Sequence, residues 1–431
     1  LPGKTMLIVQ KYGGTSVGTP ERIRAVAKRV AAVRARGDDV VAVVSAMGDS
    51  TDDLLSLAEQ VTGTDAPGKA HPREVDMLLT SGERISMALL AMAIREEGAE
   101  AISLTGSQAA IITDGMHTAA RIREVRAGRV REALGEGCVV IVAGFQGVSA
   151  EREITTLGRG GSDTTAVALA AALEADRCEI FTDVDGVFTA DPRRVPEARV
   201  VPQVSHAEMI ELAAAGAQVM HARAVDIGAR YGVDIRVLSS FVDDGADTEG
   251  RGTLITREPV RMEELALTGI TTQKGHAKIA MRGLPAGMAT STEVLARLAE
   301  AGVAVDMISE HQEPTGRVSL QVTIWQDVLD RARGVVEELT ARLGGGEWTV
   351  QGELSRVALV GSGMTGRPGV YARAFRALLD AGVDVHAVST SAISITLLVA
   401  EDLEDDALRA LHRAFELERA ADEARVAPAG R

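Results

Sequence analysis

Short apolar runs that alternate with longer amphipathic stretches constrain the fold of the first 240 residues more than any other feature. Strands that alternate with helices form a mostly parallel sheet covered on both faces, so we expect an α/β domain. The expected strands are 6–10, 39–45, 101–104, 138–143, 177–182 and 234–238, and the main expected helices are 20–36, 73–97, 206–215 and 218–230.

Length and charge narrow the class of protein. A chain of 431 residues is too long for one core, so we expect two or three domains. The net charge of −15 disfavours nucleic acid and anionic membranes as partners. Cys138 and Cys178 each begin an apolar run and are expected to be reduced core residues. No uninterrupted apolar run reaches about 18 residues and no signal peptide is visible, so we expect a cytoplasmic protein.

The C-terminal part of the chain repeats itself. The pattern of residues 298–309 recurs at 378–389, 80 residues later, and each copy is a helix followed by a strand after a Pro/Gly turn. Two such copies predict paired small α+β modules, whose exposed sheet edges favour a homodimer or a larger homo-oligomer. The expected division is a leader or artificial extension at 1–5, an α/β domain at 6–240, a linker at 241–258, modules at 259–345 and 346–420, and a flexible tail at 421–431.

Two glycine-rich segments are candidates for binding anions. Lys11–Ser16 (KYGGTS) follows a strand and precedes a helix, the geometry that points backbone N–H groups at a phosphate, although the Walker pattern is absent. Gly158–Asp163 (GRGGSD) carries Arg159, whose planar guanidinium suits a carboxylate, and Ser162 or Asp163 is expected to cap the helix that follows. Each segment could also be a plain turn.

Three further positions are open to two interpretations. Gly82 stands inside an expected helix, where glycine costs about 1 kcal/mol against alanine, so a close neighbour is expected there. Glu83 could contact a ligand or lie on the solvated surface, and Thr51 could be only an N-cap. Asp183 and Asp185 could suggest a metal site, but their spacing fits no EF-hand and suits a turn equally well.

Four motifs, in this order and ahead of a tandem repeat, make the chain resemble the aspartokinases, most closely their actinobacterial branch. The resemblance spans Met6 to about Leu417, nearly the whole chain. It implies an amino-acid-kinase three-layer sandwich followed by two ferredoxin-like ACT domains. It also implies synthesis of 4-phospho-L-aspartate from aspartate and MgATP, the first step towards lysine, threonine and methionine. The motifs are Lys11–Ser16, Ser81–Arg84, Gly158–Asp163 and Thr182–Gly186.

The resemblance also implies roles for individual residues. Lys11 would lie over the transferred phosphoryl group, with Asp163 orienting it. The acceptor carboxylate is ionised at pH 7, so no general base is expected, and Mg²⁺ would be held by the phosphates without protein ligands. Aspartate would be bound by Arg159 at a carboxylate and Glu83 at the ammonium, with Thr51 and Ser162 nearby. The expected nucleotide contacts are Lys11, Gly13, Gly14, Thr182, Asp183, Phe188, Arg193 and position 218.

Departures from the family pattern predict altered behaviour. Gln218 replaces a lysine near the nucleotide, which should weaken ATP binding by about 1–3 kcal/mol if that contact is a charged hydrogen bond. In the repeated modules, Gln273-Lys274 stands where the family has Asp-Lys before the first strand. Glu310-His311 replaces the Gln-Asn pair that binds the effector after the second strand, and Ser391–Ser394 (SAIS) replaces Ser-Glu-Ile-Arg/Lys. We therefore expect feedback by lysine plus threonine to be weakened, lost or redirected.

Two alternatives to an aspartokinase stay open at this point. One is a kinase of another aspartate-like acid, and the other is a catalytically weak protein that senses amino acids through its ACT domains. The motif residues Lys11, Glu83, Arg159 and Asp163 argue against the second, whereas Gln218 keeps it open.

Overall fold

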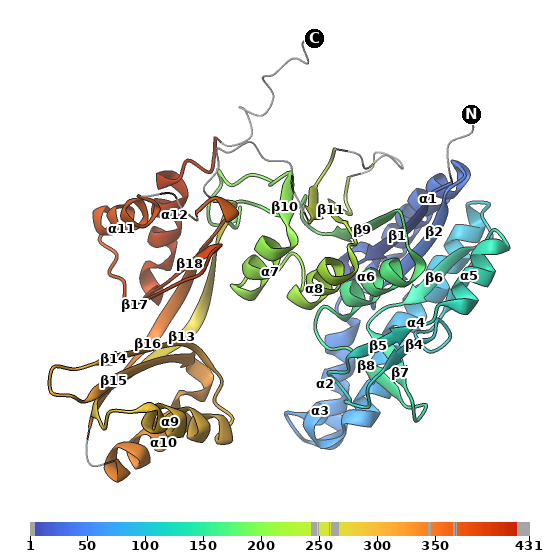
Figure 1. The fold of residues 1–431 in the computed structure, drawn as a ribbon. Coiled ribbons are helices and arrows are strands. Elements are labelled where there is room, and N and C mark those ends of the chain that lie inside the picture. Colours follow the sequence, from blue (N-terminus) through green and yellow to red (C-terminus); the bar gives the residue numbers. More distant parts are fainter. Residues whose placement is uncertain are drawn as a thin grey trace. The chain divides into compact units, whose positions relative to one another are not determined.

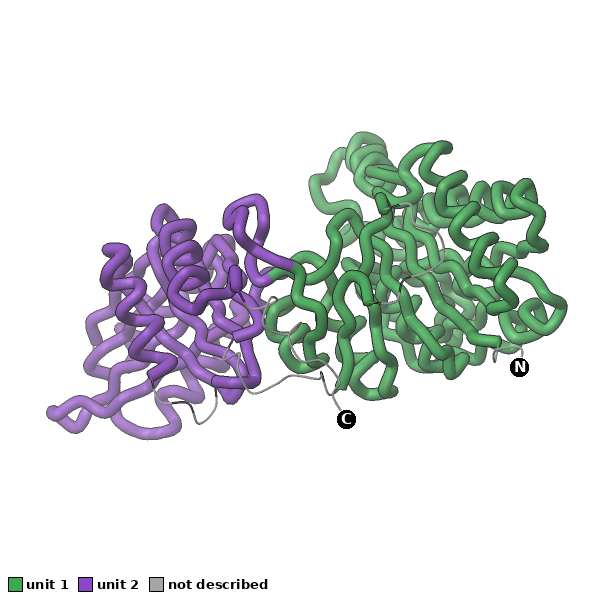
Figure 2. Tube along the Cα trace, turned by 90° about the horizontal axis from the view of Figure 1, so that it is seen from above, with its two compact units in different colours: residues 1–188, 200–214, 218–262 green, residues 189–199, 215–217, 263–431 purple. Residues whose placement is uncertain are grey.

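The computed structural model describes residues 5–242, 248, 250–257, 259, 267–343, 346–364, 367 and 369–419, which form two compact units (Figure 2). Most of the predicted leader, part of the predicted linker and the predicted tail lie outside the described residues, and the domain boundaries stay a prediction. Unit 1 comprises residues 1–188, 200–214 and 218–262, and unit 2 comprises residues 189–199, 215–217 and 263–431.

An eight-stranded sheet forms the centre of unit 1, in the order β10-β12-β11-β9-β1-β2-β6-β3 (Figure 1). Every neighbouring pair is parallel except β11 and β12, so the prediction of a mostly parallel sheet is confirmed. The strands are β1 (Leu7–Tyr12), β2 (Asp39–Val44), β3 (Ala101–Leu104), β6 (Val139–Ala143), β9 (Arg177–Thr182), β10 (Gln203–Ser205), β11 (Ile235–Ser239) and β12 (Thr253–Thr256).

Helices cover both faces of this sheet. Side chains of α1 and α4, such as Val30 and Leu90, share a core with Ile8 of β1, whereas α6 packs on β1 and β9 from the opposite face. The expected helix 218–230 begins later, at Ala222, because His221 caps it by accepting a hydrogen bond from the N–H of Arg223. The helices are α1 (Pro20–Ala35), α2 (Ser50–Thr62), α3 (Pro67–Ala70), α4 (Pro72–Glu96), α5 (Gly128–Gly135), α6 (Gly161–Leu173), α7 (His206–Ala214) and α8 (Ala222–Tyr231).

A second, four-stranded sheet in unit 1 was not predicted. Its order is β5-β4-β7-β8, and its last strand packs on α4. Strands of three or four residues are too short for an alternation of apolar and polar side chains to be recognised. They are β4 (Ile111–Thr113), β5 (Ile122–Val125), β7 (Gln146–Ser149) and β8 (Ile154–Thr156).

Helix α4 is the one described helix that is long and apolar enough to cross a membrane by length and composition. Half of its most apolar window is buried inside the protein, and that window includes Glu83, which is 3% exposed. A buried carboxyl group and close packing on α1 and β6 are the properties of a core helix in this unit.

A six-stranded antiparallel sheet dominates unit 2, in the order β14-β15-β13-β16-β18-β17. The sequence repeat is confirmed as a structural repeat, since α9–β14 and α11–β17 contain its two copies. The long strands β13 and β16 pair with each other at the centre and extend through both halves. The elements are β13 (Gly269–Leu284), α9 (Met288–Glu300), β14 (Val305–Gln312), β15 (Val318–Trp325), α10 (Leu329–Arg342), β16 (Glu347–Val360), α11 (Val370–Asp380), β17 (Ala387–Thr390), β18 (Ser394–Ala400) and α12 (Glu404–Ala414).

Two positions predicted for the first module are wrong. Gln273 and Lys274 lie within β13 rather than before it, and Glu310 and His311 lie within β14 rather than after it. Both strands continue beyond the limits suggested by their hydrophobic patterns because backbone pairing with β16 and β15 extends over polar residues.

Candidate active site

The site is built at the carboxyl ends of β1 and β2, where α/β sheets bind ligands. After β1 the chain turns through Gly13 into a short 3₁₀ helix (Gly14–Val17), and the loop after β2 approaches it. The N–H of Gly48 donates to the carbonyl of Gly14 at 3.0 Å, and a Cβ on Gly14 would lie 3.0 Å from the carbonyl oxygen of Ala46. Glycine is therefore required at position 14 for the two loops to meet.

Lys11 and Asp163 form an ion pair across this edge of the sheet. Lys11 Nζ lies 2.7 Å from Asp163 Oδ1, and each side chain is 12% exposed. The two groups are paired by charge, since their angles do not meet the criteria for a hydrogen bond. Asp163 is in the first turn of α6, and a Cβ on Gly13 would lie 3.4 Å from Lys11 Nζ. The ammonium group is thus held over a backbone that lacks a side chain, and an anion can approach it closely.

Glu83 contributes a buried carboxyl group to the same region. Its Oε1 accepts a hydrogen bond from the N–H of Ala46 at 3.3 Å, and no described group hydrogen-bonds to its Oε2. Burial raises the pKa of Glu83 to about 7. The neighbour expected at Gly82 is present, since a Cβ there would lie 2.8 Å from Cβ of Ala46. A buried carboxylate that lacks a cation fits an ammonium ligand.

Ser162 and Thr51 lie at the starts of two helices, but neither is an N-cap. The prediction that Ser162 or Asp163 caps α6 is therefore wrong, and so is the alternative interpretation of Thr51 as only an N-cap. Gly160 caps α6 because its positive φ of 66° turns the chain two residues earlier than expected, and Asp49 occupies the cap position of α2. Ser162 is buried, and its Oγ accepts a hydrogen bond from Ser45 Oγ at 2.9 Å. Thr51 is half-buried in the first turn of α2.

Arg159 projects from the loop between β8 and α6. It is exposed, and it stands between Gly158 and Gly160, both of which have positive φ. A Cβ on Gly160 would lie 2.2 Å from Cβ of His221, so the loop runs directly against α8. Arg159 is four residues from Asp163, which keeps their Cα atoms within about 15 Å. The structure thus places this loop at the N-terminal end of α6, which carries Asp163, the ion-pair partner of Lys11.

The predicted nucleotide contacts beyond the glycine turn are divided between the two units, with Arg193 in unit 2 and the others in unit 1. Thr182 ends β9 and Asp183 follows it beside the glycine turn, where the N–H of Gly13 donates to the carbonyl of Phe181 at 3.4 Å. Phe188 forms a β-bridge with Val200 in the same unit. Arg193 belongs to unit 2, where its exposed guanidinium pairs with Asp191 at 2.8 Å. Gln218 is exposed before α8.

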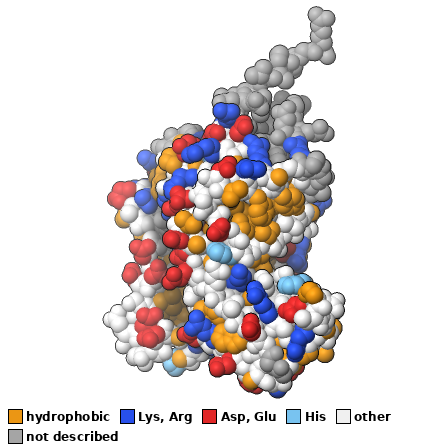
Figure 3. All heavy atoms as spheres, turned by 90° about the vertical axis from the view of Figure 1, so that its left-hand side faces the viewer, with side chains coloured by type: hydrophobic (Ala, Val, Ile, Leu, Met, Phe, Trp, Pro, Cys, Tyr) orange, Lys and Arg blue, Asp and Glu red, His pale blue; other side chains and the backbone are white. Residues whose placement is uncertain are grey.

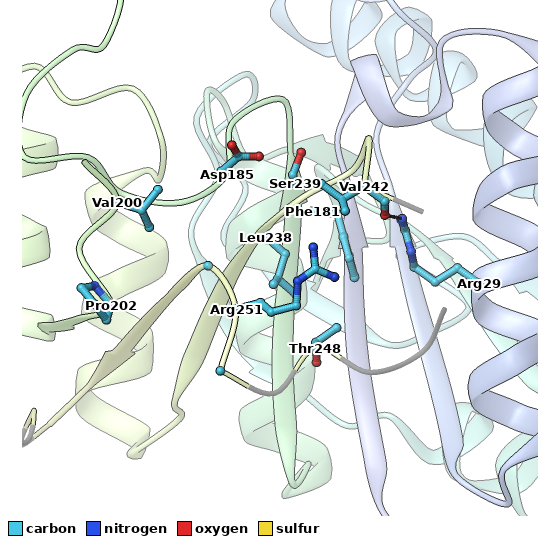
Figure 4. A pocket seen from close by; sticks show the side chains of 12 residues that line it. Arg29, Phe181, Asp185, Val200, Pro202, Leu238, Ser239, Val242, Thr248 and Arg251 are labelled. Carbon is cyan, nitrogen blue, oxygen red and sulfur yellow. Dashed lines mark hydrogen bonds between the residues drawn. The ribbon is translucent and has the colours of Figure 1, made fainter. Parts of the chain in front are cut away.

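A cavity of about 410 Å³ opens in unit 1, between α1 and the ends of β9 and β11 (Figure 4). Arg29 reaches over the ring of Phe181 at 4.8 Å and donates to the carbonyl of Val242 at 2.8 Å. None of the residues predicted individually for the site lines this cavity, but Phe181, whose carbonyl accepts from Gly13, and Asp185 of the Thr182–Gly186 motif do, so the cavity adjoins the glycine turn. Sequence reasoning missed it, since its wall joins segments far apart in the chain.

The described part of the chain contains no group of three or more His, Cys, Asp or Glu side chains arranged around one point. The cationic Lys11, the close approach of the backbone at Gly13 and Gly14, and the buried Glu83 can instead bring an anionic donor and a zwitterionic acceptor together. These groups suit phosphoryl transfer between small molecules.

Comparison with known proteins agrees with the class that this fold and site define. Residues 6–239 match the amino acid kinase family, and residues 357–415 match an ACT domain. The chain is 49% identical to the aspartokinase of Mycolicibacterium smegmatis over 414 residues, 95% of this chain and 96% of that protein. It is 47% identical over 419 residues to the aspartokinase of Corynebacterium glutamicum, with 95% and 96% coverage.

Solved structures give the same result. E. coli aspartokinase III in complex with aspartate and ADP aligns with a TM-score of 0.75 and 25% identity over 95% of this chain and 99% of that chain. An aspartate kinase from Synechocystis aligns with a TM-score of 0.52 and 40% identity over 95% of this chain and 69% of that one. The chain belongs to the aspartokinase family.

Proposed function

We propose that this protein transfers the γ-phosphoryl group of ATP to the side-chain carboxylate of L-aspartate, giving 4-phospho-L-aspartate and ADP. The observation that carries the proposal is the Lys11–Asp163 ion pair above Gly13, beside a buried Glu83 that lacks a cation. Its relatives named aspartokinase, and the E. coli aspartokinase III structure with aspartate and ADP, support the choice of substrates.

In this reaction a carboxylate oxygen of aspartate attacks the γ-phosphorus, a new O–P bond forms, and the bond to the β,γ-bridging oxygen breaks. The bridging oxygen keeps the electron pair and leaves with ADP. No proton has to move, because the acceptor is already ionised at neutral pH. Lys11 offsets the negative charge of the two anions, which is the main requirement for phosphoryl transfer. Asp163 holds the ammonium in place.

Aspartate recognition follows from the remaining charges. Glu83 would bind the substrate ammonium with the carboxylate oxygen that has no hydrogen-bond donor, and Arg159 would bind a substrate carboxylate. Ser162 and Thr51 are proposed to lie beside the bound substrate. Removal of Glu83 leaves the substrate ammonium without its partner in a buried site, so aspartate binding should weaken strongly.

The nucleotide is proposed to enter as MgATP. Backbone N–H groups at Gly13 and Gly14 would contact the phosphates, with further contacts at Thr182, Asp183, Phe188, Arg193 and Gln218. Mg²⁺ would arrive on the phosphates and neutralise part of their charge. The neutral side chain of Gln218 cannot form an ion pair with a phosphate, so we expect a higher KM for ATP than a lysine at this position would give.

The first test measures ADP release with and without aspartate and traps the acyl phosphate with hydroxylamine. We expect aspartate-dependent ADP release and a hydroxamate, and Lys11→Ala should lower turnover at least about a hundredfold. Lys28→Ala, a change at an exposed lysine on α1, is the control and should keep turnover. ADP release that needs another acid would support the alternative substrate, and no release with any acid would support a sensing protein.

Oligomerisation is proposed to occur through unit 2. The edge strand β14 is exposed along most of its length, and α11 presents Tyr371, Phe375 and Leu379 to solvent at one-turn spacing. Figure 3 shows hydrophobic side chains gathered among charged ones on one face of the molecule. Unpaired strand edges and exposed apolar stripes favour association of identical chains. Light scattering on the purified protein would give the number of chains.

A further inference from the structure

A buried carboxylate on α4 has no part in the proposed reaction. Asp76 is fully buried, and it lies seven residues before Glu83 on the same helix, which puts both on one side of α4 two turns apart. A carboxylate taken out of water is costly unless hydrogen-bond donors surround it. The described donors to Asp76 come from one loop and from Thr156, where β8 ends and a second loop begins.

The first loop contributes a histidine and a backbone amide. His117 Nδ1 lies 2.6 Å from Asp76 Oδ2, and because a carboxylate can only accept, this nitrogen carries the proton. The N–H of Thr118 donates to Asp76 Oδ1 at 3.0 Å. Asp76 therefore holds the chain just before Ala120, whose own N–H donates to the carbonyl of Thr156 at 2.9 Å.

The second loop is the one that carries Arg159. Thr156, the last residue of β8, donates from Oγ1 to Asp76 Oδ1 at 2.6 Å, three residues before Arg159. The backbone beyond it packs against the first loop, since a Cβ on Gly158 would lie 3.2 Å from the carbonyl oxygen of Thr118. The position of the arginine loop thus depends directly on Asp76.

Arg223 of α8 also links the two loops. Its Nη1 donates to the carbonyl of Leu157 at 3.0 Å, and its Nη2 donates to the carbonyl of Ala120 at 2.8 Å. The two loops are therefore joined by a carboxylate on α4 and by a guanidinium on α8. Because both groups satisfy backbone or buried polar atoms, small shifts of either loop would break several hydrogen bonds together.

We propose that Asp76 is a positioning residue that sets the distance between Glu83 and Arg159. One helix would then hold both recognition groups, Glu83 directly and Arg159 through the Asp76–Thr156 hydrogen bond. The distance between Glu83 and Arg159 would then select an acid whose ammonium and carboxylate are separated as in aspartate. This inference rests on the proposed function, because it assigns Glu83 and Arg159 to the two ends of the substrate.

The sharpest test removes one hydroxyl and keeps the shape of the side chain. Thr156→Val takes away the donor to Asp76, and Thr156→Ser keeps it. The matched control is Thr113→Val in β4, which removes a buried hydrogen bond of the same length to β8, the 2.6 Å contact between Thr113 Oγ1 and Thr155 Oγ1, and leaves the hydrogen bonds of Asp76 in place. The measurements are KM for aspartate, KM for ATP, kcat and thermal stability.

We expect Thr156→Val to raise KM for aspartate about tenfold, with KM for ATP changed less than about twofold, since the lost bond has a charged acceptor. Thr156→Ser should restore KM for aspartate. Thr113→Val should lower stability to a similar degree with KM for aspartate unchanged. Equal effects of Thr156→Val and Thr113→Val on KM for aspartate, or an unchanged KM in Thr156→Val, would overturn the inference.

A second measurement separates this inference from the proposed function. Backbone hydrogen exchange of residues 157–161 in the ligand-free protein should become faster in Thr156→Val and stay unchanged in Thr156→Ser. If the wild-type protein shows no aspartate-dependent turnover, the proposed function fails while this exchange result still tests the link to Asp76. If turnover is normal and exchange does not change, only the link to Asp76 is refuted.

Discussion

The carboxyl group of Glu83 is 3% exposed and has one described hydrogen-bond donor, the backbone N–H of Ala46. Its folded pKa of about 7 lies above the ordinary value of 4.5, so between these pH values the folded state holds a proton that the unfolded chain has released. The free energy of unfolding should therefore fall by about 3 kcal/mol as the pH rises from 4.5 to 7, and then level off.

Glu83→Gln tests how the charge of this carboxyl group affects aspartate binding and the stability of the folded protein. Without ligand, the variant should be more stable than the wild type at pH 8 and nearly equal to it at pH 4.5. Its KM for aspartate should be about 10- to 100-fold higher at pH 8, because the ionic partner of the substrate ammonium is lost. Wild-type KM for aspartate should fall as the pH rises through 7, whereas KM of the variant should lack this dependence. Thermal melts and initial rates at several pH values measure these effects.

The control for this prediction is Glu208→Gln. Glu208 is also buried on a helix, and its carboxylate accepts hydrogen bonds from the backbone and hydroxyl of Ser205. The change should leave KM for aspartate and its pH dependence as in the wild type. A pH-dependent KM that persists in Glu83→Gln would assign the titration to another group.

At the scale of elements, α4 is the part of the fold on which the site most depends. Alanine stabilises a helix interior by about 1 kcal/mol over glycine, yet at Gly82 the added Cβ would lie 2.8 Å from Cβ of Ala46. Gly82→Ala should therefore displace the loop after β2, lower the melting temperature and raise KM for aspartate. Gly334→Ala, at an uncrowded position within α10, should raise the melting temperature instead. Equal stabilisation by both changes would refute the proposed crowding.

Sequence periodicity predicted six of the eight strands of the large sheet and the main helices that cover it. It missed β10 and β12 of that sheet as well as β4, β5, β7 and β8, all of which have only three or four residues. It also placed the cap of α6 at Ser162 or Asp163, although positive φ at Gly160 ends the loop earlier. Glycine signals a turn but does not specify the residue at which the helix begins.

The site itself could be predicted only in part. Lys11 and Asp163 are 152 positions apart, and no local pattern pairs them, so their association came from the family resemblance. Asp76 was missed because its donors, His117, Thr118 and Thr156, come from loops whose contacts depend on the folded chain. Buried polar networks of this kind join distant segments and leave no periodic signal in the sequence.

At the scale of the whole molecule, unit 2 contains the departures from the family sequence pattern that we expect to alter regulation. Glu310, where the family has glutamine, accepts a hydrogen bond from the buried Ser291 at the start of α9. A carboxylate there would repel the carboxylate of an amino acid effector, and glutamine would not. E. coli aspartokinase III has been solved in complex with lysine and aspartate.

We therefore expect lysine and threonine, alone or together at sub-millimolar concentration, to leave the initial rate of the wild-type enzyme nearly unchanged. Restoring the family pair with Glu310→Gln and His311→Asn removes the negative charge, and it should increase inhibition at least about tenfold if charge alone blocks the effector. Glu337→Gln on the exposed face of α10 removes the same charge elsewhere in unit 2 and should have no effect. Strong combined inhibition of the wild type would show that Glu310 and His311 still permit effector binding, and the loss of feedback would then be rejected whatever the restored variant does.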